Sequence, residues 1–250
     1  MFRLLRLKPP HGWKAVTWEL AIVVAGVVIA LGVQQWADQR SAKVKADKAL
    51  STIRDDAWSH YLFAVEWRTV EPCINAQIDQ LSERLARSNA TIVPAPVFSE
   101  PGFDSYVLRI PNRIYSKDAW QAALYEGVTG DFPRATLRNL IAIYARFDTM
   151  NAANELNNVA YSAVFGLSRP LPIDASSRLQ FMRLLDEMRS RVEYMGLIAT
   201  QIIANLDEAG LSPNRKEIVR ELQNGGTVRF CQTRKLPLRN ISEATGSPAH

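Results

Sequence analysis

The sequence predicts an all-α protein in which an N-terminal transmembrane helix continues into a helical bundle with one long proline-rich loop. Three observations lead to this fold class. Apolar residues recur at spacings of three and four through most of the chain, sustained strand alternation is missing, and a charge-free apolar run lies near the N-terminus. With 250 residues, 47% apolar and 22% charged, the chain is too apolar for disorder and too charged for a multi-pass membrane protein.

Residues 15–36 form the predicted transmembrane helix, which follows a basic tail at residues 1–14. From residue 20 to residue 33 no side chain is charged or an amide, and the 19 residues 15–33 would span about 28 Å as a helix. Indole rings favour the boundary between water and lipid, so we expect three tryptophans to be interface anchors: Trp13, Trp18 and Trp36.

A cleaved signal peptide is the main alternative to a retained anchor. The only small-residue pair near the end of the run, Ala30 and Gly32, makes a poor cleavage site, so we expect the anchor to remain. Four basic residues stand on each side of the span: Arg3, Arg6, Lys8 and Lys14 before it, and Arg40, Lys43, Lys45 and Lys48 after it. Because a short basic N-terminus tends to stay in the cytoplasm, we expect the N-terminus inside and the body outside.

Three residues of the span are candidates for contact with another membrane helix. Glu19 is an ionisable group within the apolar run, and it either reaches back to the interface or pairs with a membrane partner. Gly26 and Ala30 have the small-residue spacing that lets two helices approach closely, as in a homodimer. The lipid bilayer is therefore one expected partner, and a second membrane protein or a second copy is another.

The span resembles a bacterial family of single-pass membrane proteins whose domain has no assigned function. The matching positions are Glu19, Gly26, Ile29, Ala30, Leu31, Gln34, Gln35 and Trp36. The chain departs from the family at Trp18, where the family has glycine, and at Gln35, where it has asparagine. A looser resemblance covers residues 119–127 and Ile143-Tyr144. The resemblance implies an anchor in the bacterial inner membrane and a helical body, and it implies no activity.

Residues 37–68 are expected to form a juxtamembrane helix that docks into its own bundle. The helix has an apolar stripe made of Ala46, Leu50, Ile53, Ala57, Tyr61 and Ala64. Pro72 is expected to end this helix, and a second one should follow with Ile74, Ile78, Leu81 and Leu85 on one face. The bundle domain is predicted to cover residues 69–226.

The prolines between residues 88 and 116 predict a long loop with at most a short strand at residues 105–110. Such a loop is either functional or a cover, and we expect a cover held across the bundle by Phe98, Phe103 and Tyr106.

Four further helices are expected after the loop, and an irregular basic tail should occupy residues 227–250. Ser116 should cap a short helix with Trp120 and Leu124, and residues 131–133 should open a long one. The stripe of this long helix is Leu137, Leu140, Ile141, Tyr144, Phe147, Leu156, Val159 and Ala163. Asp174 or Ser176 should cap the next helix, whose face is Leu179, Met182, Leu185, Met188, Val192, Met195, Ile198, Ile202 and Leu206, and the last helix covers residues 213–223.

Cys73 and Cys231 are the only thiols. In an oxidising compartment they would be able to form one disulfide, closing a loop of 158 residues, and the alternative is two unrelated buried thiols. The sequence leaves both interpretations open.

Nothing in the sequence indicates a catalytic, metal or cofactor site. Asp56 and His60 share a helix face, but no second histidine or matching ligand set accompanies them, so we expect a satisfied surface or interface histidine. The phosphate-binding, dinucleotide, nucleophile-elbow and zinc-protease motifs are missing from the sequence. Nucleic acid is not an expected partner, because only 26 of the 30 basic residues follow residue 14 and they face 25 acidic ones.

Three functional hypotheses follow. The first is a membrane-tethered helical domain that acts by binding, as a scaffold or partner of another envelope protein. The second is a sensor in which a ligand under the proline-rich loop biases the juxtamembrane helix, and it predicts a cavity lined by Trp120, Tyr144 and the loop aromatics. The third, an enzyme, has the least support, because no motif places a nucleophile, base or metal.

Overall fold

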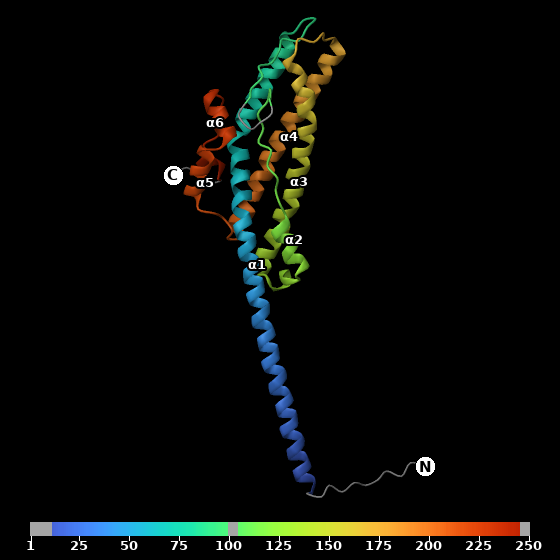
Figure 1. Ribbon diagram of the computed structural model, residues 1–250, viewed down its shortest axis with the longest axis vertical. Helices are drawn as coiled ribbons and strands as arrows, with labels where there is room; N and C mark the ends of the chain where they lie inside the picture. Colours follow the sequence, from blue (N-terminus) through green and yellow to red (C-terminus); the bar gives the residue numbers. More distant parts are fainter. Residues whose placement is uncertain (1–11, 100–104, 246–250) are drawn as a thin grey trace, which may run out of the picture.

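The computed structural model describes residues 12–99 and 105–245, and over these ranges the protein is an all-α bundle without a regular strand. Seven α-helices and two short 3₁₀ helices follow one another in these ranges: α1 (Gly12–Arg87), α2 (Asp118–Tyr125), η1 (Val128–Asp131), α3 (Arg134–Val164), η2 (Phe165–Ser168), α4 (Ala175–Glu208), α5 (Arg215–Gln223), α6 (Gly226–Thr233) and α7 (Ile241–Ala244). Figure 1 shows α1 extending far beyond the other helices at its N-terminal end.

Helix α1 is one continuous helix of 76 residues, about 114 Å long, and it is both the apolar run and the central helix of the bundle. Its large apolar side chains from Val16 to Trp36 are 37% to 69% exposed, whereas Ala46 is the first buried residue of the core. The stripe expected to dock the juxtamembrane helix is confirmed, with Leu50 half-buried and the rest buried.

The expected break at Pro72 is wrong, because Pro72 lies inside α1. A proline in a helix removes one N–H donor and crowds the preceding turn, so other contacts must compensate. In that turn, the Thr69 carbonyl accepts the backbone N–H of Arg239 at 3.0 Å. Val70 and Ile74 on either side are fully buried. The C-terminal segment thus packs against α1 at the turn where local propensity predicts an end.

The body is built from α1, α3 and α4. Helix α4 packs against both of the others, and it runs antiparallel to α3, as the hydrogen bond from Arg146 to Gln201 and the one from Arg191 to Asn157 show at successive levels. Residues 105–117, which we call the strap, run in an extended path between α1 and α3 (Figure 1). The loop expected at residues 88–116 is therefore present, but its short strand is reduced to one bridge between Phe98 and Tyr106.

The buried face of α3 is partly different from the expected one. The first half of α3 follows the prediction, because Leu140, Tyr144 and Phe147 are buried. In the second half, Leu156 and Val159 are 55% and 67% exposed. Ile141 and Ala163 are also exposed, and so is Leu179 at the start of α4. In place of the expected stripe, the inward side chains of α3's second half are Met150, Ala153, Asn154, Asn157, Ala160 and Val164.

The C-terminal segment is not an irregular tail, since α6 and α7 lie within it and it packs along α1 beside α5 (Figure 1). Arg239 Nη2 lies 3.3 Å from Glu71 Oε2, and Arg68 donates to the Ala244 carbonyl at 2.6 Å. Glu71 lies about 50 Å along the helix from Trp36. Arg239 of this segment therefore contacts the middle of α1, far from the end of the apolar run.

Helix ends follow the expected chemistry at several points. Asp174 caps α4 by accepting the backbone N–H of Ser177 at 2.7 Å, and Gly210 ends it with a φ of 69°, a conformation that favours glycine. At α2 the N-cap is Lys117 rather than Ser116, whose hydroxyl accepts the backbone N–H of Asp118.

Candidate functional site

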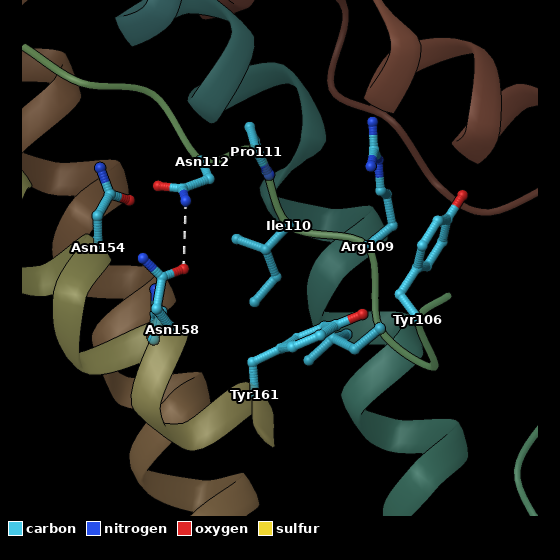
Figure 2. Close-up of a pocket in the computed structure, with 10 residues that line it drawn as sticks. Tyr106, Arg109, Ile110, Pro111, Asn112, Asn154, Asn158 and Tyr161 are labelled. Atoms are coloured by element: carbon cyan, nitrogen blue, oxygen red, sulfur yellow. Dashed lines mark hydrogen bonds between the residues drawn. The ribbon is translucent and has the colours of Figure 1, made fainter. Parts of the chain in front are cut away.

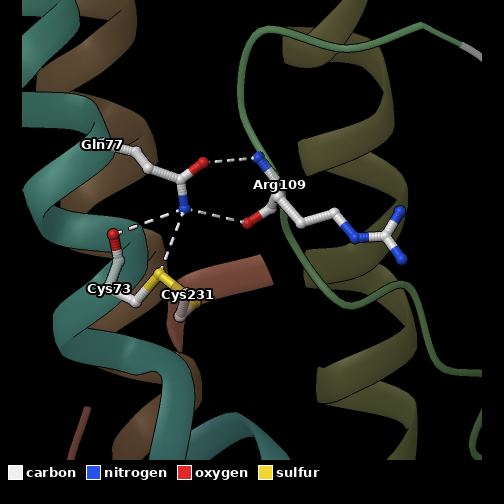
Figure 3. Close-up of a disulfide and its surroundings, with 4 residues drawn as sticks. All are labelled: Cys73, Gln77, Arg109 and Cys231. Atoms are coloured by element: carbon white, nitrogen blue, oxygen red, sulfur yellow. Dashed lines mark hydrogen bonds between the residues drawn. A yellow bond between two sulfur atoms is a disulfide. The ribbon is translucent and has the colours of Figure 1, made fainter. Parts of the chain in front are cut away.

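The strap is held to α1 by one glutamine. Gln77 accepts the backbone N–H of Arg109 at 2.7 Å and donates to the carbonyl of the same residue at 3.3 Å (Figure 3). The side-chain amide thus replaces the partner strand that this extended backbone lacks. Gln77 is buried, and its Nε2 also lies 3.5 Å from the Cys73 sulfur.

A row of asparagines on α3 holds the other side of the strap. Asn151 accepts the backbone N–H of Tyr115 at 3.0 Å and donates to its carbonyl at 2.9 Å. Asn154 donates to the Arg113 carbonyl at 2.7 Å, and Asn158 accepts the side-chain amide of Asn112 at 3.3 Å. Positions 151, 154 and 158 lie on one side of a helix, so successive amides meet successive strap residues. Side-chain amides therefore hold the strap from both sides: Gln77 from α1 and the asparagine row from α3.

A buried ion pair joins the strap to α1 as well. Glu66 is only 2% exposed, and Arg113 donates to both of its carboxylate oxygens, at 2.7 and 3.1 Å. These hydrogen bonds raise the pKa of the Arg113 guanidinium. The pair fixes the strap at Arg113, whose carbonyl also accepts a hydrogen bond from Asn154 of α3.

Between the strap and α3 lies a cleft of about 250 Å³. Figure 2 shows asparagine side chains on one side of it, two tyrosines on the other and Ile110 between them. The lining residues are Tyr106, Leu108, Arg109, Ile110, Pro111, Asn112, Asn154, Asn157, Asn158 and Tyr161. This is the candidate functional site, because it combines several side-chain amides with an apolar floor in a concave place.

The structure does not place the expected cavity around Trp120 and Tyr144. The two rings stack on each other with centroids 5.2 Å apart, and both are buried, so they fill their own space. Phe98 and Tyr106 do hold the loop, since they pack against Phe230 of α6. Phe103 lies outside the described residues.

His60 is a buried core residue, 2% exposed, whereas the sequence predicted a satisfied surface or interface histidine. Its ring lies 4.4 Å from that of Phe147 and 5.7 Å from that of Tyr115, and its Nε2 lies 3.2 Å from an Asp56 oxygen. Burial lowers the pKa of His60, with the nearby Asp56 acting in the opposite direction. Burial also raises the pKa of both tyrosines in this cluster, Tyr115 and Tyr144.

Cys73 and Cys231 are joined in a disulfide, with their Cα atoms 6.0 Å apart (Figure 3). Both residues are fully buried. Of the two interpretations that the sequence left open, the structure therefore contains the bond, which ties α6 to the middle of α1.

A second, smaller cavity of about 150 Å³ is bounded by Arg84, Arg234 and the ring of Phe98. Two arginines near an aromatic ring suggest an anion site, but both stand at helix C-termini: Arg84 in the last turn of α1 and Arg234 at the C-cap of α6. A cation there offsets the negative end of the helix dipole. Arg234 also stacks over the Phe98 ring at 4.1 Å, so both side chains have structural roles.

The candidate membrane residues all lie on the N-terminal part of α1. Trp18 and Trp36 are exposed, Arg40 lies over the Trp36 ring at 5.7 Å, and Glu19 and Ala30 are exposed. A Cβ placed on Gly26 would have no heavy atom within 4 Å, so this small-residue face is open. The side chain of Trp13 lies outside the described part of the chain, as do residues 1–11.

The described residues hold no cluster of three or more metal-ligating side chains. Comparison of the chain with protein-family models, with curated proteins and with solved structures finds no match.

The strap-holding amides are the functional residues that sequence reasoning missed. Asn151, Asn154 and Asn158 do share a helical spacing, which is the one signal that points to them. The sequence does not reveal what these amides bond to. Their partners are backbone groups of a segment about 40 residues away.

Proposed function

We propose that this protein is a membrane-anchored binding or scaffold protein of the bacterial cell envelope, with its N-terminus in the cytoplasm and its body in the periplasm. One observation carries the proposal. From residue 16 to residue 36 of α1 the apolar side chains are exposed on every side of the helix, whereas from Ala46 onward an apolar stripe is buried in the core. Helix α1 is long and apolar enough to cross a membrane, and lipid is the environment in which such a surface is stable.

The continuity of α1 gives the anchor a mechanical role. About 15 Å of helix separates Trp36 from Ala46, where the core begins, and about 60 Å more carries the body to Arg87. Because no break lies between the span and the core, the body stands upright on its anchor, and its binding surfaces are held at fixed heights above the bilayer.

The disulfide supports the proposed side of the membrane. Disulfides persist in the periplasm and are rare in the cytosol. Lysine and arginine counts do not distinguish the two sides, since four stand before the span and four after it. The bond between Cys73 and Cys231 therefore favours a body outside the cytoplasm.

A sensor is the second candidate, and the contact of Gln77 with Arg109 favours it. The same helix that crosses the proposed membrane also holds the strap, so a ligand that shifts the strap would act on α1 directly. This candidate predicts a change in α1 packing on ligand binding, measurable as altered hydrogen exchange at residues 66–77.

Fusions of alkaline phosphatase and of a fluorescent protein to the C-terminus test the proposed topology. We expect phosphatase activity without fluorescence. Fluorescence without phosphatase activity would place the body in the cytoplasm and contradict the proposal.

The binding role has its own test, which is crosslinking of the native protein in membranes followed by purification. We expect a partner protein or a second copy to be recovered with the parent chain and lost with Gly26→Leu, while Gly32→Leu, on the same helix, serves as the matched control. Equal recovery with both variants would contradict a helix contact at Gly26 and Ala30.

A further inference from the structure

We propose that the cleft between the strap and α3 binds an uncharged sugar ring. This inference rests on the binding role proposed above and names the class of ligand. The cleft is enclosed by the strap on one side and by α3 on the other (Figure 2). Its volume of about 250 Å³ is below the ~300–1,000 Å³ of sites for drug-sized ligands, so it suits a single ring of a larger molecule.

The cleft offers hydrogen-bonding atoms that the strap does not use. Asn154 donates through its Nδ2 to the Arg113 carbonyl, which leaves its Oδ1 without a partner among the described residues. Asn112 and Asn158 share one hydrogen bond, so within the same part of the chain Asn112 Oδ1 and Asn158 Nδ2 also have none. Asn154 is only 7% exposed and lines the cleft, and Figure 2 shows its side-chain oxygen on the side of Asn112. The cleft thus presents both acceptors and a donor.

These groups carry no charge. Among the described residues, none that lines the cleft is acidic, and Arg109 is the only basic one. The guanidinium of Arg109 is turned toward α6, where it would lie 3.3 Å from a Cβ placed on Gly226. A phosphate or carboxylate is normally held by such a fork, and a cation by carboxylates. A ligand of neutral donors and acceptors fits better than either.

The floor and walls favour a ring with apolar faces. Leu108, Ile110 and Pro111 form an apolar surface, and the rings of Tyr106 and Tyr161 lie at one end (Figure 2). A pyranose presents C–H groups on its faces and hydroxyls around its edge. The faces would pack on the apolar side chains while the hydroxyls bond to the asparagines, which matches this division of the cleft.

The height of the cleft indicates where the sugar comes from. Arg109 lines the cleft and is bonded to Gln77, which lies about 60 Å along α1 from Trp36. Lipid headgroups extend only about 5–8 Å beyond the hydrocarbon. The ligand is therefore a glycan in the aqueous space, and a sugar attached to a lipid headgroup is out of reach.

Titration calorimetry on the full chain in lipid nanodiscs tests the proposal, with maltotriose and an N-acetylglucosamine trimer as neutral probes. Glucuronic acid and glucosamine serve as charged probes, and a glycolipid in the nanodisc that carries the same sugar serves as the membrane source. We expect saturable binding of at least one neutral probe, weaker binding of both charged probes, and no competition by the glycolipid.

Asn158→Ala removes a cleft amide on an exposed position, so the fold should survive, and we expect it to weaken binding about tenfold. Tyr161→Leu should weaken it as well, while Asn224→Ala, an exposed asparagine outside the cleft, should bind like the parent.

The proposal is overturned if no neutral probe binds at millimolar concentration, if a charged probe binds more tightly, or if the cleft variants bind like the parent. Sugar binding by a protein that washes off membranes would instead contradict the anchor and leave the cleft assignment intact.

Discussion

The carboxylate of Glu66, buried in α1, receives two hydrogen bonds from Arg113 of the strap, at 2.7 and 3.1 Å. Removing the arginine would leave a buried carboxylate without its partner. Because the Arg113 side chain is 42% exposed, we expect Arg113→Ala to cost about 2–3 kcal/mol, less than the ~3–5 kcal/mol of a fully buried pair. Urea unfolding of the detergent-solubilised protein measures this loss.

Arg87→Ala, which breaks the exposed pair with Glu83, is the control and should change stability by less than about 0.5 kcal/mol. Equal losses in both variants would show that the buried pair does not hold the strap.

Asn151 carries two hydrogen bonds to the backbone of Tyr115, and we expect Asn151→Ala to loosen the strap. The unpaired backbone groups should cost about 1–3 kcal/mol and open the segment to solvent. Limited proteolysis and hydrogen exchange over residues 105–117 check this result. If strap protection is unchanged while Asn151→Ala lowers global stability, the amide row supports the core and does not fasten the strap.

The disulfide should contribute substantially to stability. It closes a loop of 158 residues, and in the chain-entropy model its loss costs up to about 5 kcal/mol. We expect a reductant to lower the midpoint of thermal unfolding of the parent and to leave a Cys73→Ser, Cys231→Ser double variant unaffected. Thiol alkylation of protein taken directly from cells provides the second check, since two reactive thiols would contradict both the bond and the proposed compartment.

His60 should make stability depend on pH. Burial lowers its pKa below 6.5 in the folded protein, so the unfolded chain binds a proton more readily than the folded one. Above about pH 6.5 both states are neutral and the effect is constant, and stability is lost as the pH falls from there toward the folded pKa. We expect His60→Gln to reduce the slope of unfolding free energy against pH in this window. An unchanged slope would mean that other groups dominate, including Glu71, whose pKa is raised by burial.

Periodicity predicted the helices well because most of them bury an apolar stripe. The faces of α1 at Ile53 and Ile78 and of α4 at Met188 and Ile202 are all buried as expected. The same rule chose the wrong side of α3 beyond Met150. There the inward positions include Asn154 and Asn157 among small and apolar residues. These amides are stable inside because Asn154 donates to the Arg113 carbonyl of the strap and Asn157 accepts a hydrogen bond from Arg191 of α4. Apolar spacing carries no information about a polar segment packed against the helix.

At Pro72 the local propensity of proline also predicts the wrong structure, since α1 continues through it. The prediction of a break used the chemistry of proline alone, whereas the contacts around this turn in the fold come from Arg239 and from the bond between Cys73 and Cys231, more than 150 residues away. Gly196 is a further case, since a Cβ at this position would lie 2.6 Å from Glu71 Oε2. A side chain at this position would therefore displace the Glu71 carboxylate, which pairs with Arg239, and nothing in the sequence indicates this constraint.

We propose that the apolar part of α1 stays in the bilayer and holds the body upright. Intact-mass analysis of the protein that remains in the membrane pellet after an alkaline carbonate wash tests it most directly. We expect the protein in the pellet, with a mass that includes residues 15–36. Protein released into the wash, or a mature chain that begins beyond Trp36, would contradict it.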